Sequence, residues 1–278
     1  MKDDFNSSAD DRIGRLFDRL SKVPEGEDIV TFLKFNNVKI ELWPNPYNWA
    51  ASTLTITSIK DGVYHYKDPV IILREDLSDE NLLQAIVHET GHINQHLSGI
   101  GNPDRVLTER EYILFYRAAE AAAQALATEI TWKLKQAGDD GPWEATKFVG
   151  YHDICDAYEK AVTTDPSSAT DGRARRAAFD AWFDNAERLA TYNRSTVEGM
   201  IPSLANGRDN IFKDHGLVEK PLDNTWVQKL DDAMGPPSSL QLSGLRDLLF
   251  DPHYARDTHT RPADPSNTND FSPPPAMF

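Results

Sequence analysis

The spacing of apolar residues changes along this chain, and each spacing predicts a different kind of element. In residues 10–22 and 28–35, apolar side chains recur every three or four positions, which predicts two short amphipathic helices. Val38, Ile40 and Leu42 then alternate with polar residues, which is typical of a half-buried strand. The chain therefore begins with helices and turns to a sheet after them.

Short extended segments continue this second pattern. Asp61-Gly62 is a pair favoured in two-residue hairpin turns, and it separates the segments 53–60 and 63–67. Residues 70–73 are apolar throughout and predict a further strand, whose edge could bind an extended peptide by adding it to the sheet. We therefore expect a small, mostly antiparallel sheet.

Helical spacing prevails in the rest of the chain. Ser78 is placed as an N-cap, and the acidic residues after it complement the positive end of a helix. The predicted helices cover residues 78–98, 108–136, 142–162 and 177–192, with short helices near 225–234 and 240–249. Residues 257–278 are rich in Pro, Asp, Ser, Thr and Asn, and predict a disordered tail.

These elements divide the chain into four parts. Residues 1–37 hold the N-terminal helices, and residues 38–137 hold the strands and the next two helices. Residues 138–256 form a helical region that completes the fold or a cleft, and residues 257–278 form the tail. The expected class is α+β, with a small sheet packed on one helix and a mainly helical C-terminal half.

Composition narrows the class of protein. A hydrophobic content of 40% and a charged content of 26% in 278 residues are ordinary for a soluble globular protein. The net charge of −15 argues against a nucleic-acid partner, because phosphate binding requires clustered cations. No apolar run could span a bilayer, and the polar N-terminus lacks the apolar core of a signal peptide. With Cys155 as the one cysteine, we expect a cytoplasmic protein, with leaderless export as the alternative. The composition makes no prediction of the oligomeric state.

The residues His88-Glu89-Thr90-Gly91-His92 form an HExxH motif inside a predicted helix. Histidines at positions i and i+4 lie on one helical face about one turn apart, so both imidazoles can bind one ion. Glu89 projects near the same face, where it can act as general base toward a water on that ion. Gly91 costs about 1 kcal/mol relative to alanine in a helix interior. A glycine at this position would be explained if another element crosses the helix there below the metal, or if the helix simply packs tightly.

A catalytic zinc ion usually has three protein ligands and one open position, so a third ligand is needed. His96 continues the i, i+4 series, but it lies about 12 Å from His88 along the helix axis, too far to share a tetrahedral ion. A metzincin would have a third histidine six positions after His92, where this chain has Ser98. Neither residue completes the site.

Glutamates of the next predicted helix are the remaining candidates, namely Glu109, Glu111, Glu120 and Glu129. Glu109 and Glu111 lie in the first turn, where capping and the helix dipole account for them. We expect Glu129 to face solvent. Glu120 lies in a run of alanines, and small side chains let two helices approach as closely as shared ligands require. We favour Glu120 as the third ligand; the alternative is a solvated glutamate in an alanine-rich helix.

A peptidase also needs a hydrogen-bond donor near the developing oxyanion. His152, Tyr116 and Tyr192 are candidates that the sequence does not rank. Carboxylates that orient the metal-binding histidines are expected as well. The candidates for that role are Asp104, Asp153 and Asp156.

The HExxH motif, followed by Glu-x-x-Ala-Gln-x-Leu-Ala, resembles the gluzincin metallopeptidases, in particular ImmA/IrrE-like peptidases and bacterial putative-metallopeptidase domains. The matching positions are His88, Glu89, His92, Glu120, Ala123, Gln124, Leu126 and Ala127, and the resemblance covers roughly residues 38–137. It implies a zincin-like fold and a Zn²⁺ ion held by the two histidines and the glutamate. It further implies a zinc-dependent endopeptidase that hydrolyses a protein or peptide substrate through a zinc-bound water activated by Glu89.

Two other functions fit the same residues. A zincin-like protein without catalytic activity could serve as a binding or regulatory protein, although the intact Glu89 argues against this. The protein could also be a metallopeptidase effector delivered into another cell. Such an effector would catalyse the same reaction as the endopeptidase described above and would differ from it only in location.

Overall fold

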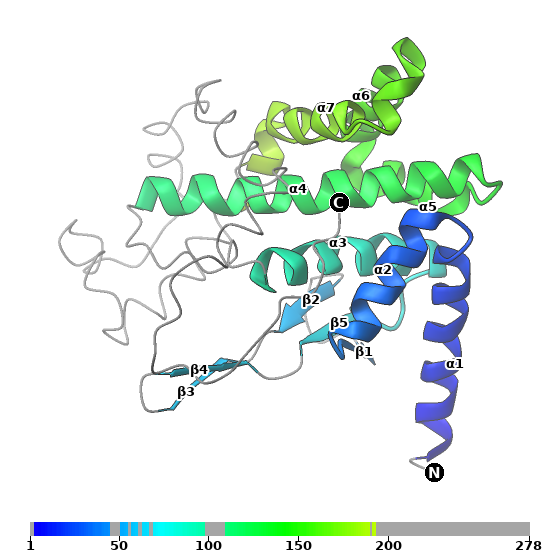
Figure 1. The fold of residues 1–278 in the computed structure, drawn as a ribbon, viewed down its shortest axis with the longest axis vertical. Helices are drawn as coiled ribbons and strands as arrows, with labels where there is room; N and C mark the ends of the chain where they lie inside the picture. Colours follow the sequence, from blue (N-terminus) through cyan, green and yellow to red (C-terminus); the bar gives the residue numbers. More distant parts are fainter. Residues whose placement is uncertain are drawn as a thin grey trace.

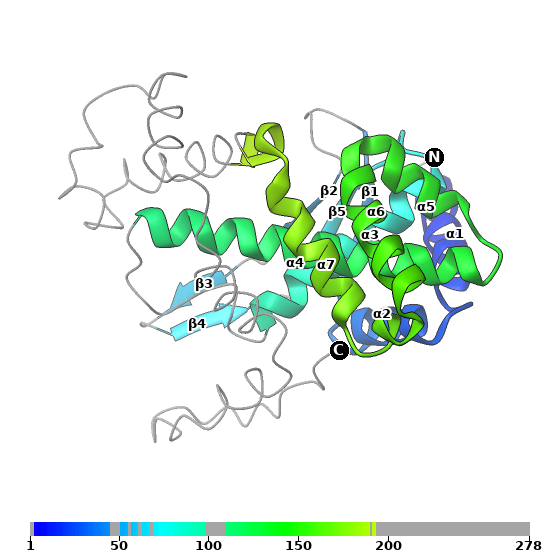
Figure 2. The same ribbon diagram turned by 90° about the horizontal axis from the view of Figure 1, so that it is seen from above.

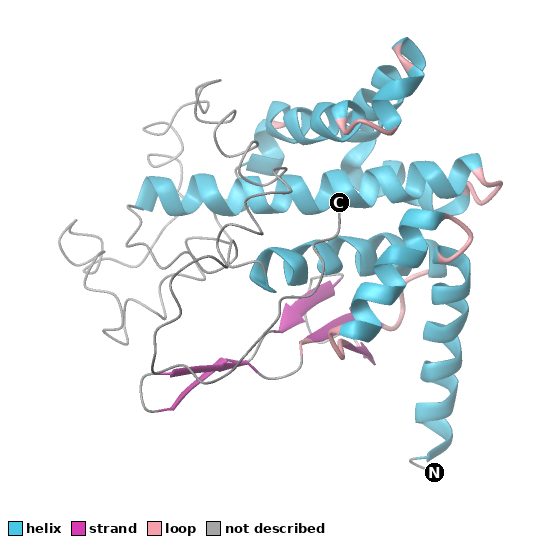
Figure 3. Cartoon of the chain, viewed as in Figure 1, coloured by secondary structure: helices cyan, strands magenta, loops and turns pink. Residues whose placement is uncertain are grey.

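The computed structural model describes residues 3–44, 51–54, 57–60, 63–66, 69–97, 109–189 and 191–192 of the chain. Helices make up most of this part and strands a small share (Figure 3), which is consistent with the α+β prediction. The predicted helices near 225–234 and 240–249 and the predicted tail at 257–278 lie outside the described residues. Within the described ranges, no helix combines the length and the apolar content needed to cross a membrane.

A three-stranded sheet has the strand order β1-β5-β2 and lies below the helix labelled α3 in Figure 1. The central strand β5 (Val70–Arg74) pairs in parallel with β1 (Lys39–Trp43), with Ile40 opposite Ile71. On its other side, β5 pairs antiparallel with β2 (Ala51–Leu54). The sheet is therefore mixed, whereas we expected a mostly antiparallel one.

The apolar segment 70–73 lies at the centre of this sheet and not at an edge. Ile71, Ile72 and Leu73 are all buried, as in a strand covered on both faces. Since β1 and β2 pair with its two sides, the prediction that this strand offers an edge to a peptide is wrong. The outer strands of the sheet, among the described ones, are β1 and β2.

The predicted hairpin is confirmed. Strand β3 (Thr57–Lys60) pairs antiparallel with β4 (Val63–Tyr66), with Lys60 opposite Val63. The single strand expected over residues 53–60 is divided, because β2 ends at Leu54 before β3 begins.

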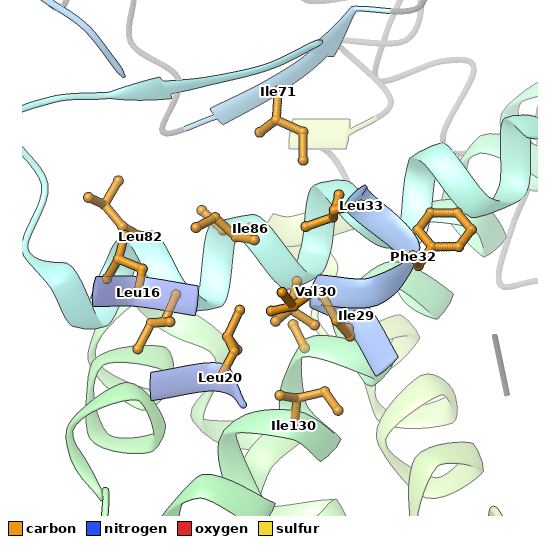
Figure 4. Packing of buried hydrophobic residues seen from close by; sticks show 14 of the residues in the cluster. Leu16, Leu20, Ile29, Val30, Phe32, Leu33, Ile71, Leu82, Ile86 and Ile130 are labelled. Carbon is orange, nitrogen blue, oxygen red and sulfur yellow. The ribbon is translucent and has the colours of Figure 1, made fainter. Parts of the chain in front are cut away.

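Four helices and the sheet contribute side chains to the first hydrophobic core. Helices α1 (Asp3–Leu20), α2 (Pro24–Phe35) and α3 (Asp79–Leu97) meet there, and α3 carries the HExxH motif. Figure 4 shows side chains of this core, including Leu16, Leu20, Ile29, Leu33, Ile71, Leu82, Ile86 and Ile130. The motif helix is thus fixed by apolar contacts from several elements.

The beginning of α3 is also held by polar contacts. Ser78 accepts a hydrogen bond from the backbone N–H of Asn81 through its hydroxyl oxygen, at 3.3 Å, which supports its predicted role as N-cap. Arg12 of α1 donates to the Asp79 carboxylate at 2.7 Å and to the carbonyl oxygen of Leu77. These contacts fix where α3 enters the core.

Helix α4 (Glu109–Gln136) is the long central helix and matches its predicted range. It packs against α3 on one side and against α7 (Arg173–Ala181) and α6 (His152–Thr164) on the other, as Figures 1 and 2 show. Residues of α4 take part in both hydrophobic cores. Ile130 belongs to the first, and Ala118 belongs to the second, which includes aromatic residues of the C-terminal helices.

The C-terminal helices are more broken than their apolar spacing predicted. In place of one helix over 142–162, α5 (Gly141–Thr146) leads through a π-helical turn, η1 (Lys147–Tyr151), into α6. The break falls at Gly150, whose φ of 103° is a conformation that residues with a Cβ rarely adopt.

A short 3₁₀ turn, η2 (Pro166–Ala169), precedes α7. The helix predicted over 177–192 begins earlier, at Arg173, and ends at Ala181. It is followed by another 3₁₀ turn, η3 (Trp182–Asp184), and residues 186–189 and 191–192 of the predicted range are helical again.

Glu129 corrects one prediction about α4. We expected this side chain to face solvent, but only 5% of the residue is exposed. Its carboxylate pairs with Lys133 at 2.8 Å and also with Arg175. The expectation was wrong because α7 covers this face of α4.

Candidate metal site

The two histidines of the motif lie one turn apart on the same face of α3. Their Nε2 atoms are 3.1 Å apart, and their ring planes are 80° from each other. Both side chains are mostly buried, with 13% of His88 and 21% of His92 exposed. Two ring nitrogens at this distance can share one proton between them or direct two lone pairs at one cation.

Glu120 of α4 brings a carboxylate to the same position. One carboxylate oxygen is 3.4 Å from His88 Nε2, and the other is 3.3 Å from His92 Nε2. Possible ligand atoms of the three residues all lie within 4.8 Å of one another. The structure thus brings together the three side chains that the sequence selected from two separate helices.

The spacing of these atoms fits a zinc-sized cation. Ligands about 2.0–2.2 Å from a tetrahedral ion stand roughly 3.3 Å from one another. The closest contacts here are 3.1, 3.4 and 3.3 Å. Two imidazoles and one carboxylate are also a donor set found around catalytic zinc, which leaves a fourth position open. The residues therefore fit a divalent cation.

Electrostatics couple the three side chains. Burial, the largest single effect, lowers the pKa of His92. The charge of Glu120 and its hydrogen bond, with smaller effects from Glu89 and Gln95, together outweigh burial and raise this pKa to about 9. Burial raises the pKa of Glu120, whereas the charge of His92 and a hydrogen bond from His88 lower it to a value well below the ordinary range. The carboxylate is therefore ionised at neutral pH and ready to bind a cation.

Glu89, the acidic residue of the motif, is also buried, with 7% of the residue exposed. It lies close enough to His92 and to Tyr151 to act electrostatically on both. A carboxylate next to a metal-binding group in a mostly buried site is placed to accept and donate protons.

Tyr192 is the candidate oxyanion donor that the structure brings to this site. Its hydroxyl donates a hydrogen bond to the Glu120 carboxylate, which can only accept, and it also contacts the Tyr151 hydroxyl. Burial raises the pKa of Tyr192 well above its usual value, and the negative charge of Glu120 adds to this effect. Tyr192 therefore keeps its proton at neutral pH and can act as a hydrogen-bond donor.

The other two candidate donors are placed differently. His152 is the first residue of α6, and its side chain is exposed. Tyr116 lies one turn before Glu120 on α4, and 42% of this residue is exposed. Tyr192 is therefore the candidate for which a hydrogen bond to Glu120 is seen.

The carboxylates predicted to orient the histidines pair with basic residues instead. Asp153 accepts hydrogen bonds from Arg188, the shorter at 2.7 Å, and Asp156 forms an ion pair with Lys147 at 2.9 Å. Asp104 lies outside the described residues.

The sequence reasoning missed two side chains near the histidines and Glu120, Gln95 and Tyr151. The Oε1 atom of Gln95 is 3.0 Å from Nδ1 of His92, and Gln95 Nε2 donates to the carbonyl oxygen of Ala119 at 2.8 Å. The position of Gln95 three residues after His92 is a signal for a neighbour on the same helix face. No sequence pattern near Tyr151 indicates that it lies near these residues, because its position depends on the π-helical turn η1.

Comparisons with known proteins identify a family. No curated protein and no solved structure matches the chain. The model of a family described as "Putative metallopeptidase family (DUF6782)" matches residues 53–209, which is more than half of the chain and includes the HExxH motif and Glu120. The chain therefore belongs to this putative metallopeptidase family.

Proposed function

We propose that this protein is a zinc-dependent endopeptidase in which His88, His92 and Glu120 hold the cation and Glu89 transfers the proton. The observation that carries the proposal is the convergence of the three donor groups at 3.1–3.4 Å. Membership of a metallopeptidase family supports the same reaction class and implies a metal cofactor and a protein substrate.

When bound, the cation would act as a Lewis acid toward a water molecule and the carbonyl of the peptide bond. Glu89 would accept the proton of the attacking water and then deliver it to the leaving amine. Its place directly after His88 on α3 gives it a fixed position relative to the ligands. Because Glu89 is largely buried, few bulk water molecules would compete with the attacking water for its carboxylate.

Tyr192 is our proposed oxyanion donor. Its hydroxyl lies next to Glu120, so it is near the place where negative charge develops on the carbonyl oxygen. The contact with Tyr151 would hold the phenol in place. Arg188 lies over the Tyr151 ring, with its guanidinium carbon 5.4 Å from the ring centroid.

A peptide substrate could extend the sheet at β2. This strand is an outer strand among those described, and it contacts α3, which carries the motif. An extended peptide that pairs with an outer strand gains backbone hydrogen bonds that do not depend on its sequence. This would place its backbone near the helix that carries His88 and His92.

The first experiment measures the zinc content of purified protein. We expect about one zinc per chain in the wild type and essentially none in a His88→Ala, His92→Ala double variant. His96→Ala is the matched control, because His96 lies one turn further along α3 and should leave the zinc content unchanged. Equal, low zinc in the wild type and the double variant would refute the metal site.

The second experiment separates a peptidase from a binding or regulatory protein. Glu89→Gln keeps the size of the side chain and removes the base, so a peptidase should retain zinc and lose turnover. New protein termini produced by the wild type and not by Glu89→Gln, identified by mass spectrometry of a treated proteome, would also reveal the substrate. Full cleavage by Glu89→Gln would contradict the proposed role of Glu89.

A further inference from the structure

One side chain connects a proposed metal ligand on α3 to the backbone of α4. Gln95 lies three residues after His92 and is 8% exposed. Its Oε1 atom is 3.0 Å from His92 Nδ1, and its Nε2 atom donates to the Ala119 carbonyl oxygen at 2.8 Å. Ala119 immediately precedes Glu120, so a single amide spans the two proposed ligands.

Hydrogen-bond chemistry fixes the orientation of this amide. A backbone carbonyl oxygen can only accept, so the NH₂ group of Gln95 must face Ala119. The carbonyl oxygen of Gln95 then faces His92, and it can only accept as well. His92 must therefore carry a proton on Nδ1, which leaves Nε2 as the nitrogen with a free lone pair in the neutral ring.

The tautomer selected in this way is the one that metal binding at this site needs. Nε2 of His92 is the atom that lies 3.3 Å from Glu120 and 3.1 Å from His88. The opposite tautomer would place a proton on Nε2, between the three groups, where it would compete with a cation. His88 differs, since its buried Nδ1 has no hydrogen-bond partner among the described residues.

We propose that Gln95 is a positioning residue that holds His92 in the Nδ1-protonated tautomer and ties this ligand to the α4 backbone next to Glu120. This inference rests on the proposed metal site and adds a residue to it. Contacts of this kind typically change metal affinity about 10- to 100-fold when they are removed.

The alternative is that Gln95 only links two helices, and a second pair of residues allows the two roles to be separated. Gln84 of α3 donates to the side-chain oxygen of Gln124 on α4 at 3.1 Å. This bond also joins α3 to α4 between two amide side chains, but it does not contact His92. Gln84→Met is therefore a matched control for Gln95→Met.

The test uses full-length protein labelled with ¹⁵N-histidine and has two readouts. NMR of the zinc-free protein at alkaline pH, where the imidazole is neutral, reports the tautomer of His92. Competition with a chromophoric chelator reports the dissociation constant for Zn²⁺. We expect Gln95→Met to lose the single Nδ1-protonated tautomer and to bind Zn²⁺ about 10- to 100-fold more weakly. Gln84→Met should match the wild type in both readouts.

A conservative variant provides the rescue arm. Gln95→Glu keeps an acceptor for His92 Nδ1–H but cannot donate to Ala119, so we expect it to retain the tautomer and to bind Zn²⁺ within a few-fold of the wild type. The inference is overturned if Gln95→Met keeps the wild-type tautomer, or if Gln84→Met weakens Zn²⁺ binding to the same extent. Failure of the wild type to bind Zn²⁺ would refute the metal site instead, while the NMR readout would still test the role of Gln95.

Discussion

Gly91 of α3 lies directly against Ala123 of α4. A Cβ atom added at Gly91 would stand 3.1 Å from both the Cα and the Cβ atom of Ala123. The glycine lies one residue before His92, and the alanine lies three residues after Glu120. The close approach of the two helices at this point allows ligands from both to reach one position, which explains why glycine is present despite its low helix propensity.

The first prediction concerns Gly91→Ala. The added methyl group would push on the backbone of α4, and we expect a net loss of roughly 1 kcal/mol, because overpacking outweighs the gain in helix propensity. Zinc binding should weaken as well, since α3 must move away from Glu120. Urea denaturation and zinc competition measure the two effects.

Gly14→Ala is the control for that experiment. Gly14 also lies within a helix, α1, but a Cβ atom there would have no neighbour within 4 Å. We expect this variant to gain up to about 1 kcal/mol of stability. An equal gain from Gly91→Ala would show that the helix crossing does not need glycine.

The second prediction concerns the buried carboxylate of Glu129. Glu129→Gln removes the carboxylate that pairs with Arg175 and Lys133, whereas Lys133 keeps its ion pair with Glu25. Breaking a buried ion pair typically costs about 3 kcal/mol, and we expect a loss up to about that size. Chemical denaturation measures the loss. Glu159→Gln is the control, since Glu159 pairs with Lys135 at 3.4 Å and both side chains are more exposed. That control should cost less than about 1 kcal/mol, and similar losses from both variants would contradict the prediction.

The third prediction is a pH dependence of cation binding. Because the fold raises the pKa of His92 from 6.5 to about 9, protonated His92 stabilises the cation-free protein fully below pH 6.5, and this contribution is lost as the pH rises through 9. A cation must displace the same proton. We therefore expect Zn²⁺ affinity to rise about tenfold per pH unit between pH 6.5 and pH 9 and then to level off.

Chelator competition across this range measures the slope. Glu120→Gln removes the charge that raises the His92 pKa, so its weaker binding should level off at a lower pH. A wild-type affinity that does not change between pH 6.5 and pH 9 would count against the predicted proton competition.

The fourth prediction concerns Tyr192→Phe. Loss of an oxyanion donor typically lowers kcat about 100-fold or more. Zinc binding should weaken as well, because the hydrogen bond to Glu120 is lost, so kcat is compared at saturating zinc. Tyr116→Phe removes the same hydroxyl from an exposed position and should keep wild-type turnover. Steady-state kinetics with a peptide substrate measures kcat of both variants and of the wild type. An unchanged kcat in Tyr192→Phe would exclude Tyr192 as the oxyanion donor.

Residues that the sequence could place are those governed by local geometry. The turn spacing of a helix alone puts His88 and His92 on one face, and the run of alanines around Glu120 indicated a close helix contact. The hairpin followed in the same way from Asp61-Gly62 and its flanking segments.

Residues that the sequence could not place depend on distant partners. Arg175, which pairs with Glu129, comes 46 residues later in the chain. The parallel pairing of β1 with β5 joins strands that are separated by a hairpin and a third strand. Tyr192 reaches Glu120 only because the C-terminal helices fold back over α4. None of these relationships has a periodic signal in the chain.

Helix α4 belongs to both hydrophobic cores, and this has a consequence for how an ion would enter and leave. Because apolar contacts on both sides hold α4, the Glu120 carboxylate has its position before an ion binds. The ligands of small zinc domains differ, since these domains fold only when the metal binds. Removal of the ion by a chelator should therefore abolish the activity while the protein stays folded. Addition of the ion should then restore the activity without a refolding step.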